Sequence, residues 1–360
     1  MKERCAWLDT LKGWGILFIV LGHIVGAGVH LSSGFGQTFC DAAYKYFYAF
    51  HVPLFFVVAG MTFRQREWKP FFIGKIQRLL FPYLLFGLFS IVVFGLFFPQ
   101  IRDILTTAET TGYYQYKATL LPFWKQVANL FLGGWWPLGF AANSVLWFIP
   151  VLFSVEVVAQ LCSRVLKVWW QWGLVAVVLY VLPHVIVLPQ LPFGLRLVPD
   201  YLLYFVLGTF WGLKEIPCSR RWLLIVSALG LLLLFGGVAV WNPWQYFPRT
   251  IGQHGLKMIL TCGCIGGWLC LSQCVTLRWI VQMGMWSLAI MLLHKFPVVF
   301  FQNFVSPIRN LYTGGFVLLL AGLLLVSLLS IGLTCLGCRC IQRFCPWLIG
   351  MKKKSMRVDA

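Results

Sequence analysis

Five ionisable side chains lie inside strongly apolar stretches, and side chains of these types can bind or transfer protons. They are Lys12, His23, His51, Glu156 and His294. An ionisable group is costly in hydrocarbon, so such residues face the protein interior and mark functional sites. A neutral histidine can take up a proton near pH 7, and a carboxylate can orient its ring. The set predicts an interior site for proton transfer, although each histidine taken alone is also typical of a structural interhelical hydrogen bond.

The spacing in the first apolar stretch places three polar residues on one helical face. Asp9, Lys12 and His23 coincide at the angular period of an α-helix. The step from Lys12 to His23 rises about 16 Å along a helix. Lys12 is therefore expected near the cytoplasmic boundary, where its amine can reach water, and His23 near the middle of the membrane.

The other three residues are expected at similar depths. His51 is followed by Pro53 in a helix that descends from the outer face, so it should lie in the outer half of the membrane. His294 and Glu156 lie near the middle of their segments, and Glu156 is expected to pair with a histidine or with Lys12. These groups are predicted to line one interior cavity.

A cluster of basic residues precedes and enters the third apolar stretch. Lys75 and Arg78 are three residues apart, and Arg64, Arg66 and Lys69 lie just before them. Two interpretations stay open at this point. The cluster is either ordinary cytoplasmic charge or a clamp for the phosphates of a cofactor.

The elements that must position these residues are membrane helices. Of the 360 residues, 60% are hydrophobic and 11% are charged, well below the charge of a soluble domain. Several apolar runs reach the length needed to cross a bilayer. We predict an all-α, polytopic, multi-pass membrane protein with about ten transmembrane helices at 11–30, 45–63, 78–98, 144–163, 168–188, 198–213, 222–241, 256–275, 283–303 and 314–337.

The membrane topology explains the net charge of +19. Lysine and arginine collect in cytoplasmic loops of membrane proteins, and most of those in this chain fall on one side if both termini are cytoplasmic. Nucleic acid is therefore not an expected partner. We predict one membrane domain over 1–345 and a basic cytoplasmic tail over 346–360 that binds anionic lipid. The first apolar run carries Asp9 and His23, so it is interpreted as a helix and not as a cleaved signal peptide.

Two further stretches have a functional and a simpler interpretation. The long connection from Pro99 to Asn143 is rich in aromatic residues, which favours an interfacial belt on the outer face over a sugar-binding surface. Its aromatic residues are Tyr113, Tyr114, Tyr116, Trp124, Trp135 and Trp136. The cysteines near the end fit a zinc site only loosely, so reduced thiols and no metal are expected. They are Cys335, Cys338, Cys340 and Cys345.

Several common catalytic motifs do not occur in the sequence. There is no G-x-S-x-G nucleophile motif and no phosphate-binding Walker loop. The H-x-x-x-x-D pattern also fails, since the residues five positions after the three histidines are Gly28, Phe56 and Val299. No two acidic residues lie close enough to suggest a D-x-D metal site, which argues against a nucleotide-sugar glycosyltransferase.

Several stretches together resemble a known family. They are W-L-D-T-L-K-G-W-G-I-L-F-I-V-L-G-H, F-H-V-P-L-F-F-V-V-A-G, K-I-Q-R-L-L-F-P-Y, N-S-V-L-W-F-I-P-V-L-F and M-G-M-W-S-L-A-I-M-L-L-H. The sequence resembles the membrane acyltransferase-3 family, with the fucose 4-O-acetylase-like branch as the most similar part. The resemblance implies transfer of an acyl group, usually acetyl, from acyl-CoA to a hydroxyl of a surface or secreted glycan. It also implies a membrane-only member in the cell (inner or plasma) membrane.

The resemblance implies roles for particular residues. The family's basic residue and histidine, separated by ten residues, correspond to Lys12 and His23, and its basic-x-x-Arg motif corresponds to Lys75 and Arg78. Many members have arginine where this chain has Lys12 and Lys75, and lysine keeps the charge without the planar guanidinium. Lys12, Lys75 and Arg78 are therefore expected to bind the acetyl-CoA donor.

The expected mechanism uses His23 as the general base. Glu156 would orient its imidazole, and His51 or His294 would polarise the thioester or bind the acceptor, a glycan or lipid-linked sugar. An acyl-histidine relay is a second route. The alternatives to a glycan acyltransferase are a transporter of a solute or lipid-linked sugar, a lipid O-acyltransferase that uses His294, and a structural scaffold. A homo-oligomer is compatible with all of them.

Overall fold

The computed structural model describes residues 5–93, 122–133, 143–189, 191–216, 219–240 and 251–349, and all secondary structure in these ranges is helical. Short 3-10 and π helices carry the label η. The first half contains α1 (Ala6–Leu31), α2 (Gly34–Thr62), α3 (Trp68–Lys75), η1 (Ile76–Leu80), α4 (Phe81–Val92), α7 (Phe123–Phe131), η3 (Ser144–Trp147), α8 (Phe148–Val165) and α9 (Trp169–Val185).

The second half continues with helices of very different lengths. They are η4 (Pro192–Leu197), α10 (Val198–Trp211), α11 (Arg220–Val240), α12 (Ile251–Cys274), α13 (Arg278–Met285), α14 (Ser287–Leu293), α15 (Lys295–Phe304), α16 (Ser306–Thr313), α17 (Phe316–Phe344) and η5 (Pro346–Ile349).

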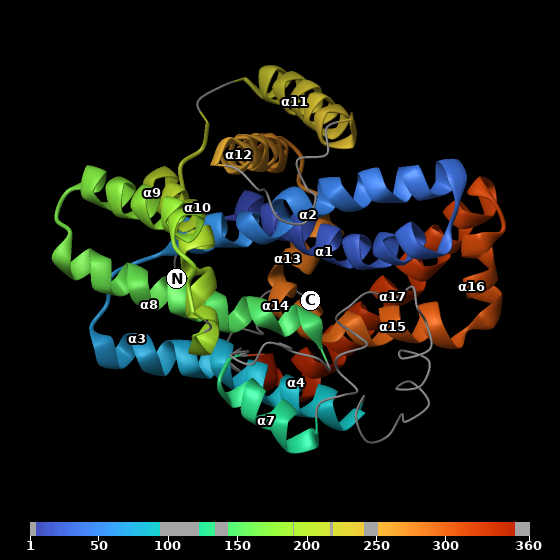
Figure 1. Ribbon diagram of the computed structural model, residues 1–360, viewed down its shortest axis with the longest axis horizontal. Coiled ribbons are helices and arrows are strands. Elements are labelled where there is room, and N and C mark those ends of the chain that lie inside the picture. The colour runs from blue at the N-terminus through green and yellow to red at the C-terminus, as the bar shows by residue number, and fades with distance from the viewer. Residues whose placement is uncertain are drawn as a thin grey trace.

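Helix α1 is the centre of the arrangement. It lies beside α2 through the middle of the molecule, and it also packs against α12, α13, α14, α15 and α17 (Figure 1). Helices α8, α9 and α10 form one end of the molecule, while α15, α16 and α17 form the other. Residues of α1 therefore meet groups from both the early and the late parts of the chain.

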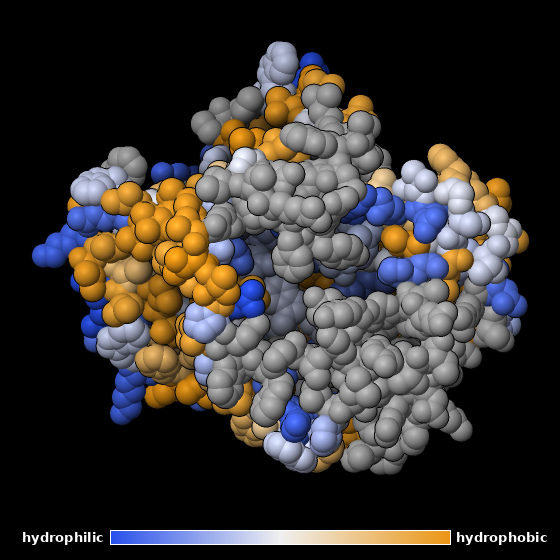
Figure 2. Space-filling view, in the orientation of Figure 1, coloured by the Kyte–Doolittle hydropathy of each residue, from blue (hydrophilic) through white to orange (hydrophobic). Residues whose placement is uncertain are grey.

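The outer surface carries many large apolar side chains. Figure 2 shows a hydrophobic surface gathered where α9 and α10 lie in Figure 1. Among the exposed apolar residues of these two helices are Leu174, Val177 and Val178 of α9 and Leu207 of α10. Exposed leucines and valines in such number are typical of a surface that faces lipid.

Seven helices of the described ranges are long and apolar enough to cross a membrane, and an eighth is counted if a bent pair forms one span. The bent pair joins α13 to the continuous stretch Ser287–Gln302 at an angle of 71°. All ten predicted segments contain helix where the structure describes them. The predicted number of about ten spans and the cytoplasmic position of both termini stay predictions.

The third span begins earlier than the sequence analysis predicted. A candidate span runs from Trp68 to Val92 through α3, η1 and α4, whereas the apolar run suggested a start at residue 78. The reason is that Lys69 and Lys75 interrupt the apolar pattern but not the helix. Helix α3 therefore brings Lys75 alongside α8.

Some predicted features lie outside the described residues. They include most of the aromatic connection, with Tyr113, Tyr114, Tyr116, Trp135 and Trp136, and residues 350–360 of the predicted basic tail. Trp124 is described, and it is exposed on the short helix α7. Helix α7 is fixed to α4 by the hydrogen bond that the Tyr83 hydroxyl donates to the Leu130 carbonyl.

Two glycines allow α1 and α13 to touch backbone to backbone. A Cβ atom on Gly13 would collide with the carbonyl of Ile280, and one on Gly284 would collide with the carbonyl of Asp9. Small residues at such crossings let membrane helices approach closely. This crossing holds the broken segment that follows α13 against α1.

Replacing Gly13 by alanine should therefore lower stability. The added methyl group meets a backbone carbonyl that cannot rotate away, so we expect a loss of about 1–3 kcal/mol from forced separation of the helices. The thermal unfolding midpoint in nanodiscs measures the effect. Gly266→Ala in α12 is the matched control, because a Cβ there meets open space. Equal midpoints for the two variants would contradict the close crossing.

Candidate functional site

Three histidines from distant parts of the chain come together beside α1. The ring centroids of His23 and His294 are 5.4 Å apart, and His51 lies within electrostatic range of both rings. His51 and His294 are fully buried, while His23 is half-buried. The helices α1 and α2 and the junction of α14 with α15 each supply one of these residues.

The proton positions on two of the rings follow from their neighbours. Nδ1 of His51 lies 2.5 Å from the Phe47 carbonyl oxygen, and Nδ1 of His294 lies 2.8 Å from the Ile290 carbonyl oxygen. A carbonyl oxygen can only accept, so both Nδ1 atoms carry the proton. In the neutral rings, Nε2 then holds the free lone pair. Nε2 of His294 is buried and has no hydrogen-bond partner among the described residues.

Tyr48 connects two of the histidines, and the sequence analysis did not select it. Its hydroxyl lies 3.1 Å from Nδ1 of His23, and its ring meets the His51 ring edge-on at 4.8 Å. The ring also packs on Gly22 of α1, where a Cβ would lie only 3.1 Å from it. The available signal was its position three residues before His51, which places both side chains on one face of α2.

Lys295 is the second residue that sequence reasoning missed. It directly follows His294 and is partly buried. It lies within electrostatic range of the rings of both His23 and His294. The signal in the sequence is a lysine within an apolar segment, directly beside a histidine.

Prolines and polar side chains explain how the histidine-bearing helices are held. Pro53 lacks an N–H group, which frees the Ala49 carbonyl within α2. The Thr261 hydroxyl of α12 donates to that carbonyl at 2.9 Å. On the other side, the Gln302 side chain of α15 donates to the Ile24 carbonyl at 3.0 Å. Helices α2 and α15 are thus both fixed close to the polar cluster.

The bend between α13 and α14 has its own anchor. Trp286 lies at the break and donates its indole N–H to Oε1 of Gln342 at 2.9 Å. This bond joins the broken segment to α17. This contact and the close approach of α1 and α13 at Gly13 and Gly284 together set the direction of α14. They therefore also set the position of His294.

Lys12 lies apart from the histidines, toward the beginning of α1. Its amine forms an ion pair with Asp9 at 2.5 Å. Both side chains belong to α1, three residues apart, so the pair forms locally. The structure therefore places Lys12 and His23 at different levels of the same helix, as the eleven-residue step requires.

Glu156 does not contact a histidine or Lys12, contrary to the expectation from the sequence. It pairs with Lys75 at 2.5 Å. The early start of α3 explains this difference, because it carries Lys75 to the buried face of α8. Oε2 of Glu156 is buried and has no partner among the described residues.

Lys75 and Arg78 have different surroundings. In a regular α-helix their three-residue spacing would keep them on one face. The π-helical turn η1 begins directly after Lys75 and contains Arg78, and its wider turn changes this phase. Lys75 faces Glu156, whereas Arg78 is exposed. Lys75 is therefore engaged in an ion pair, while Arg78 is the exposed residue of the predicted pair.

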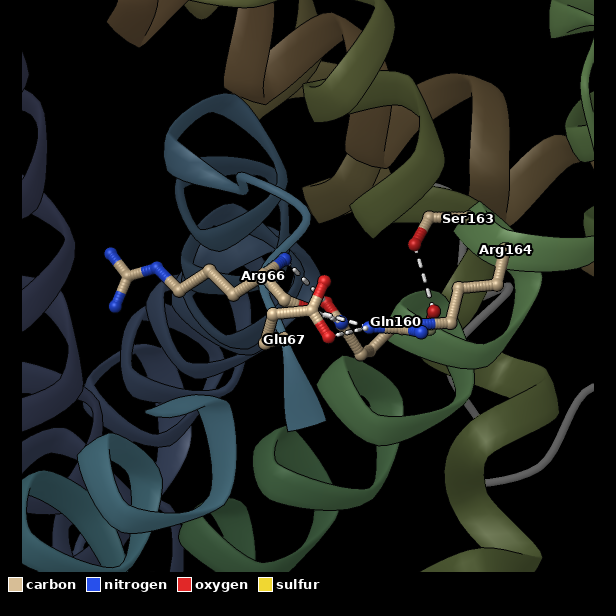
Figure 3. A network of polar contacts seen from close by, with 5 residues as sticks. All are labelled: Arg66, Glu67, Gln160, Ser163 and Arg164. Carbon is tan, nitrogen blue, oxygen red and sulfur yellow. Dashed lines mark hydrogen bonds and ion pairs between the residues drawn. The ribbon is translucent and has the colours of Figure 1, made fainter. Parts of the chain in front are cut away.

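A polar network fixes the connection between α2 and α3 to α8 (Figure 3). The buried Gln160 side chain accepts from the Arg66 backbone N–H at 3.4 Å and donates to the Arg66 carbonyl. Arg164 donates to the same carbonyl at 3.1 Å and pairs with Glu67 at 3.3 Å. Ser163 donates to the Gln160 carbonyl. The Arg66 guanidinium points away from this network, and Arg66 lies within electrostatic range of Glu156.

Glu156, Gln160 and Arg164 form one polar stripe on α8. They are spaced four residues apart, so they share a helical face. All three contact the stretch from Arg66 to Lys75. The stripe therefore holds α3 and the residues just before it against α8.

No group of three or more His, Cys, Asp or Glu side chains is arranged to hold a metal ion within the described ranges. The cysteines at the end of α17 differ in environment: Cys338 is buried, Cys340 is exposed, and Cys335 and Cys345 are intermediate.

The apolar exterior, the candidate spans and the buried polar cluster define an all-helical, multi-pass membrane protein. Residues 6–335 match the model of the acyltransferase-3 family, described as an acyltransferase domain. The chain belongs to this family of membrane acyltransferases. Comparisons with curated proteins and with solved structures gave no match.

Proposed function

We propose that this acyltransferase moves an acetyl or other short acyl group from acyl-CoA to a hydroxyl of a cell-surface or secreted glycan, or of a lipid-linked sugar. The proposal places it in the cell (inner or plasma) membrane with both termini cytoplasmic, as in the fucose 4-O-acetylase-like branch. The observation that carries it is the pair of His23 and His294 beside a membrane-embedded helix. Two imidazoles in contact, one with an unpaired buried nitrogen, suit the removal of a hydroxyl proton.

In the proposed reaction, the acceptor oxygen attacks the thioester carbonyl carbon while His23 takes the hydroxyl proton. The C–S bond then breaks, the ester remains on the acceptor, and the CoA thiolate recovers the proton from the imidazolium. His294 lies next to His23 and offers a second lone pair to the acceptor hydroxyl or to the imidazolium. His51 would act on the same group through Tyr48.

An acyl-histidine relay uses the same residues differently. His23 would attack the thioester itself, release CoA, and pass the acyl group to the acceptor in a second step. Both routes consume acyl-CoA and release free CoA, so they share the test below.

Arg78 is the strongest candidate to bind the phosphates of CoA. It is exposed on η1 and makes no ion pair among the described residues, and guanidinium groups are suited to phosphate. Lys12 and Lys75 are engaged with Asp9 and Glu156. Their proposed phosphate role requires that they exchange these partners when the donor binds.

The test is release of CoA from labelled acetyl-CoA by purified protein in nanodiscs, with glycan and lipid fractions of the host cell as acceptors. CoA should be measured by chromatography, because exposed and half-buried free cysteines such as Cys340 and Cys345 would react with thiol reagents. We expect CoA release and label in the glycan or lipid-linked sugar fraction. Label in simple lipids alone would identify a lipid O-acyltransferase.

A transporter is the second candidate. The 71° bend between α13 and α14 favours it, since broken helices line the binding sites of many transporters. Transport predicts solute flux into proteoliposomes without CoA release. Flux together with neither turnover nor binding of acetyl-CoA would contradict the proposed acyl transfer.

A further inference from the structure

Lys295 differs from the other half-buried lysines of the membrane segments. Lys12 and Lys75 each have a carboxylate at 2.5 Å, and Lys257 has Asp200 in electrostatic range. Lys295 makes no ion pair or hydrogen bond with any residue that the structure describes, and the ionisable groups that feel its charge are His23 and His294. Its amine is thus a partly buried cation without a counter-charge.

Such an arrangement is unfavourable in the resting protein. A cation in an apolar interior loses hydration and recovers the cost only beside an anion. Long lysine chains near helix ends escape by extending toward water. Lys295 follows His294 directly, in the middle of the segment that begins at Ser287. A negative group from outside the chain is the partner that would complete this site.

The position next to the histidine pair indicates which negative group this is. In a donor whose thioester reaches His23, the phosphates lie at the far end of the pantetheine arm. The charge that appears at the histidines is the one that develops on the carbonyl oxygen during acyl transfer. When the acceptor oxygen or His23 attacks the carbonyl carbon, the π electron pair moves to that oxygen. When the C–S bond breaks, the pair returns and the charge leaves with the thiolate.

On this basis, and resting on the proposed acyl transfer, we propose that the Lys295 ammonium binds the thioester carbonyl oxygen and stabilises the oxyanion of the tetrahedral intermediate. Lys295 is then a catalytic residue in its own right. Charge stabilisation of this kind acts most strongly where water is excluded. The tight packing of α15 on α1 through Gln302 and Ile24 keeps the cation in place before the donor arrives.

The proposal predicts opposite effects of one substitution on activity and on stability. Lys295→Met keeps the length of the side chain and removes the charge. We expect kcat for acyl transfer to fall about 10²–10³-fold, as when one oxyanion donor is removed, with little change in the Kd of acetyl-CoA. Because an uncompensated charge disappears, the thermal unfolding midpoint should stay equal or rise. A structural lysine would give a lower midpoint.

Two further variants sharpen the comparison. Lys295→Arg keeps a cation and should recover part of the lost kcat. Lys257→Met removes another half-buried lysine of a membrane segment, from α12, and should leave kcat unchanged. Acetyl-CoA binding is measured by titration with the protein in nanodiscs, and kcat by chromatographic CoA release.

The outcomes separate this proposal from the function on which it rests. Native-like kcat in Lys295→Met overturns the oxyanion role while leaving the acyl transfer intact. A raised Kd with unchanged kcat overturns it as well, and assigns Lys295 to ground-state binding of an anion such as a phosphate. A native protein that neither releases CoA nor binds acetyl-CoA overturns both. Loss of kcat with an unchanged Kd and an equal or higher midpoint supports the proposal.

Discussion

His23→Ala should lower acyl transfer and CoA release by about 10²–10⁴-fold, the range typical of a lost general acid–base group. His23 is the histidine that contacts both the Tyr48 hydroxyl and the His294 ring. Its loss removes the proton acceptor together with its contacts to Tyr48 and His294. The rate of CoA release from acetyl-CoA in nanodiscs measures the effect.

The chain contains a matched control for this substitution. His30→Ala makes the same change in the same helix, at an exposed position in the last turn of α1, and should keep full activity. Tyr48→Phe removes only the hydroxyl and should lower kcat by a smaller factor. A His23→Ala protein of native stability that retains full transfer would contradict both the general-base and the relay mechanism. Acyl-modified His23, detected by mass spectrometry, would select the relay.

Separating Lys75 from Glu156 should have the largest effect on stability. Lys75→Met leaves a nearly buried carboxylate without its cation, and we expect a cost of about 2–3 kcal/mol, below that of a fully buried pair because Lys75 is 29% exposed. Glu156→Leu should cost less, since the flexible lysine can extend toward water. The double variant should return close to native stability, because two apolar side chains can replace the pair. Thermal unfolding in nanodiscs gives the three midpoints.

The same variants test the assignment of Lys75 to the donor. If Lys75 exchanges partners to bind CoA phosphates, the double variant should be stable yet bind acetyl-CoA more weakly. An unchanged Kd in the double variant would remove Lys75 from the donor site and leave the pair with a structural role. Equal losses for Lys75→Met and Glu156→Leu would contradict the asymmetry that we derive from burial.

The helical segments could be predicted from the sequence, because they depend on composition and local spacing. Long apolar runs in the sequence mark the helices α1, α2, α8 and α17. Histidines within such runs stand out without any knowledge of tertiary structure. The family match from residue 6 to 335 agrees with motifs spread from the first to the ninth predicted helix.

The contacts of the site could not be predicted in the same way. The partner of Glu156 depends on where α3 begins, and the apolar pattern hid that start behind Lys69 and Lys75. The bend at Trp286 occurs without a proline at the break, and its cause lies in Gly284 and in the distant Gln342. Such contacts arise from packing between helices, which periodicity within one helix does not encode.

The contact between His23 and His294 can form only late in the synthesis of the chain. The two rings are separated by about 270 residues, so at roughly 5–20 residues per second the ribosome delivers the second tens of seconds after the first. Tyr48 belongs to α2, the next helix to be synthesised after α1. Its hydroxyl can form the hydrogen bond with Nδ1 of His23 as soon as α1 and α2 pack together. The reactive pair therefore forms only when synthesis is nearly complete, and chains that end before α14 would reach the membrane without it.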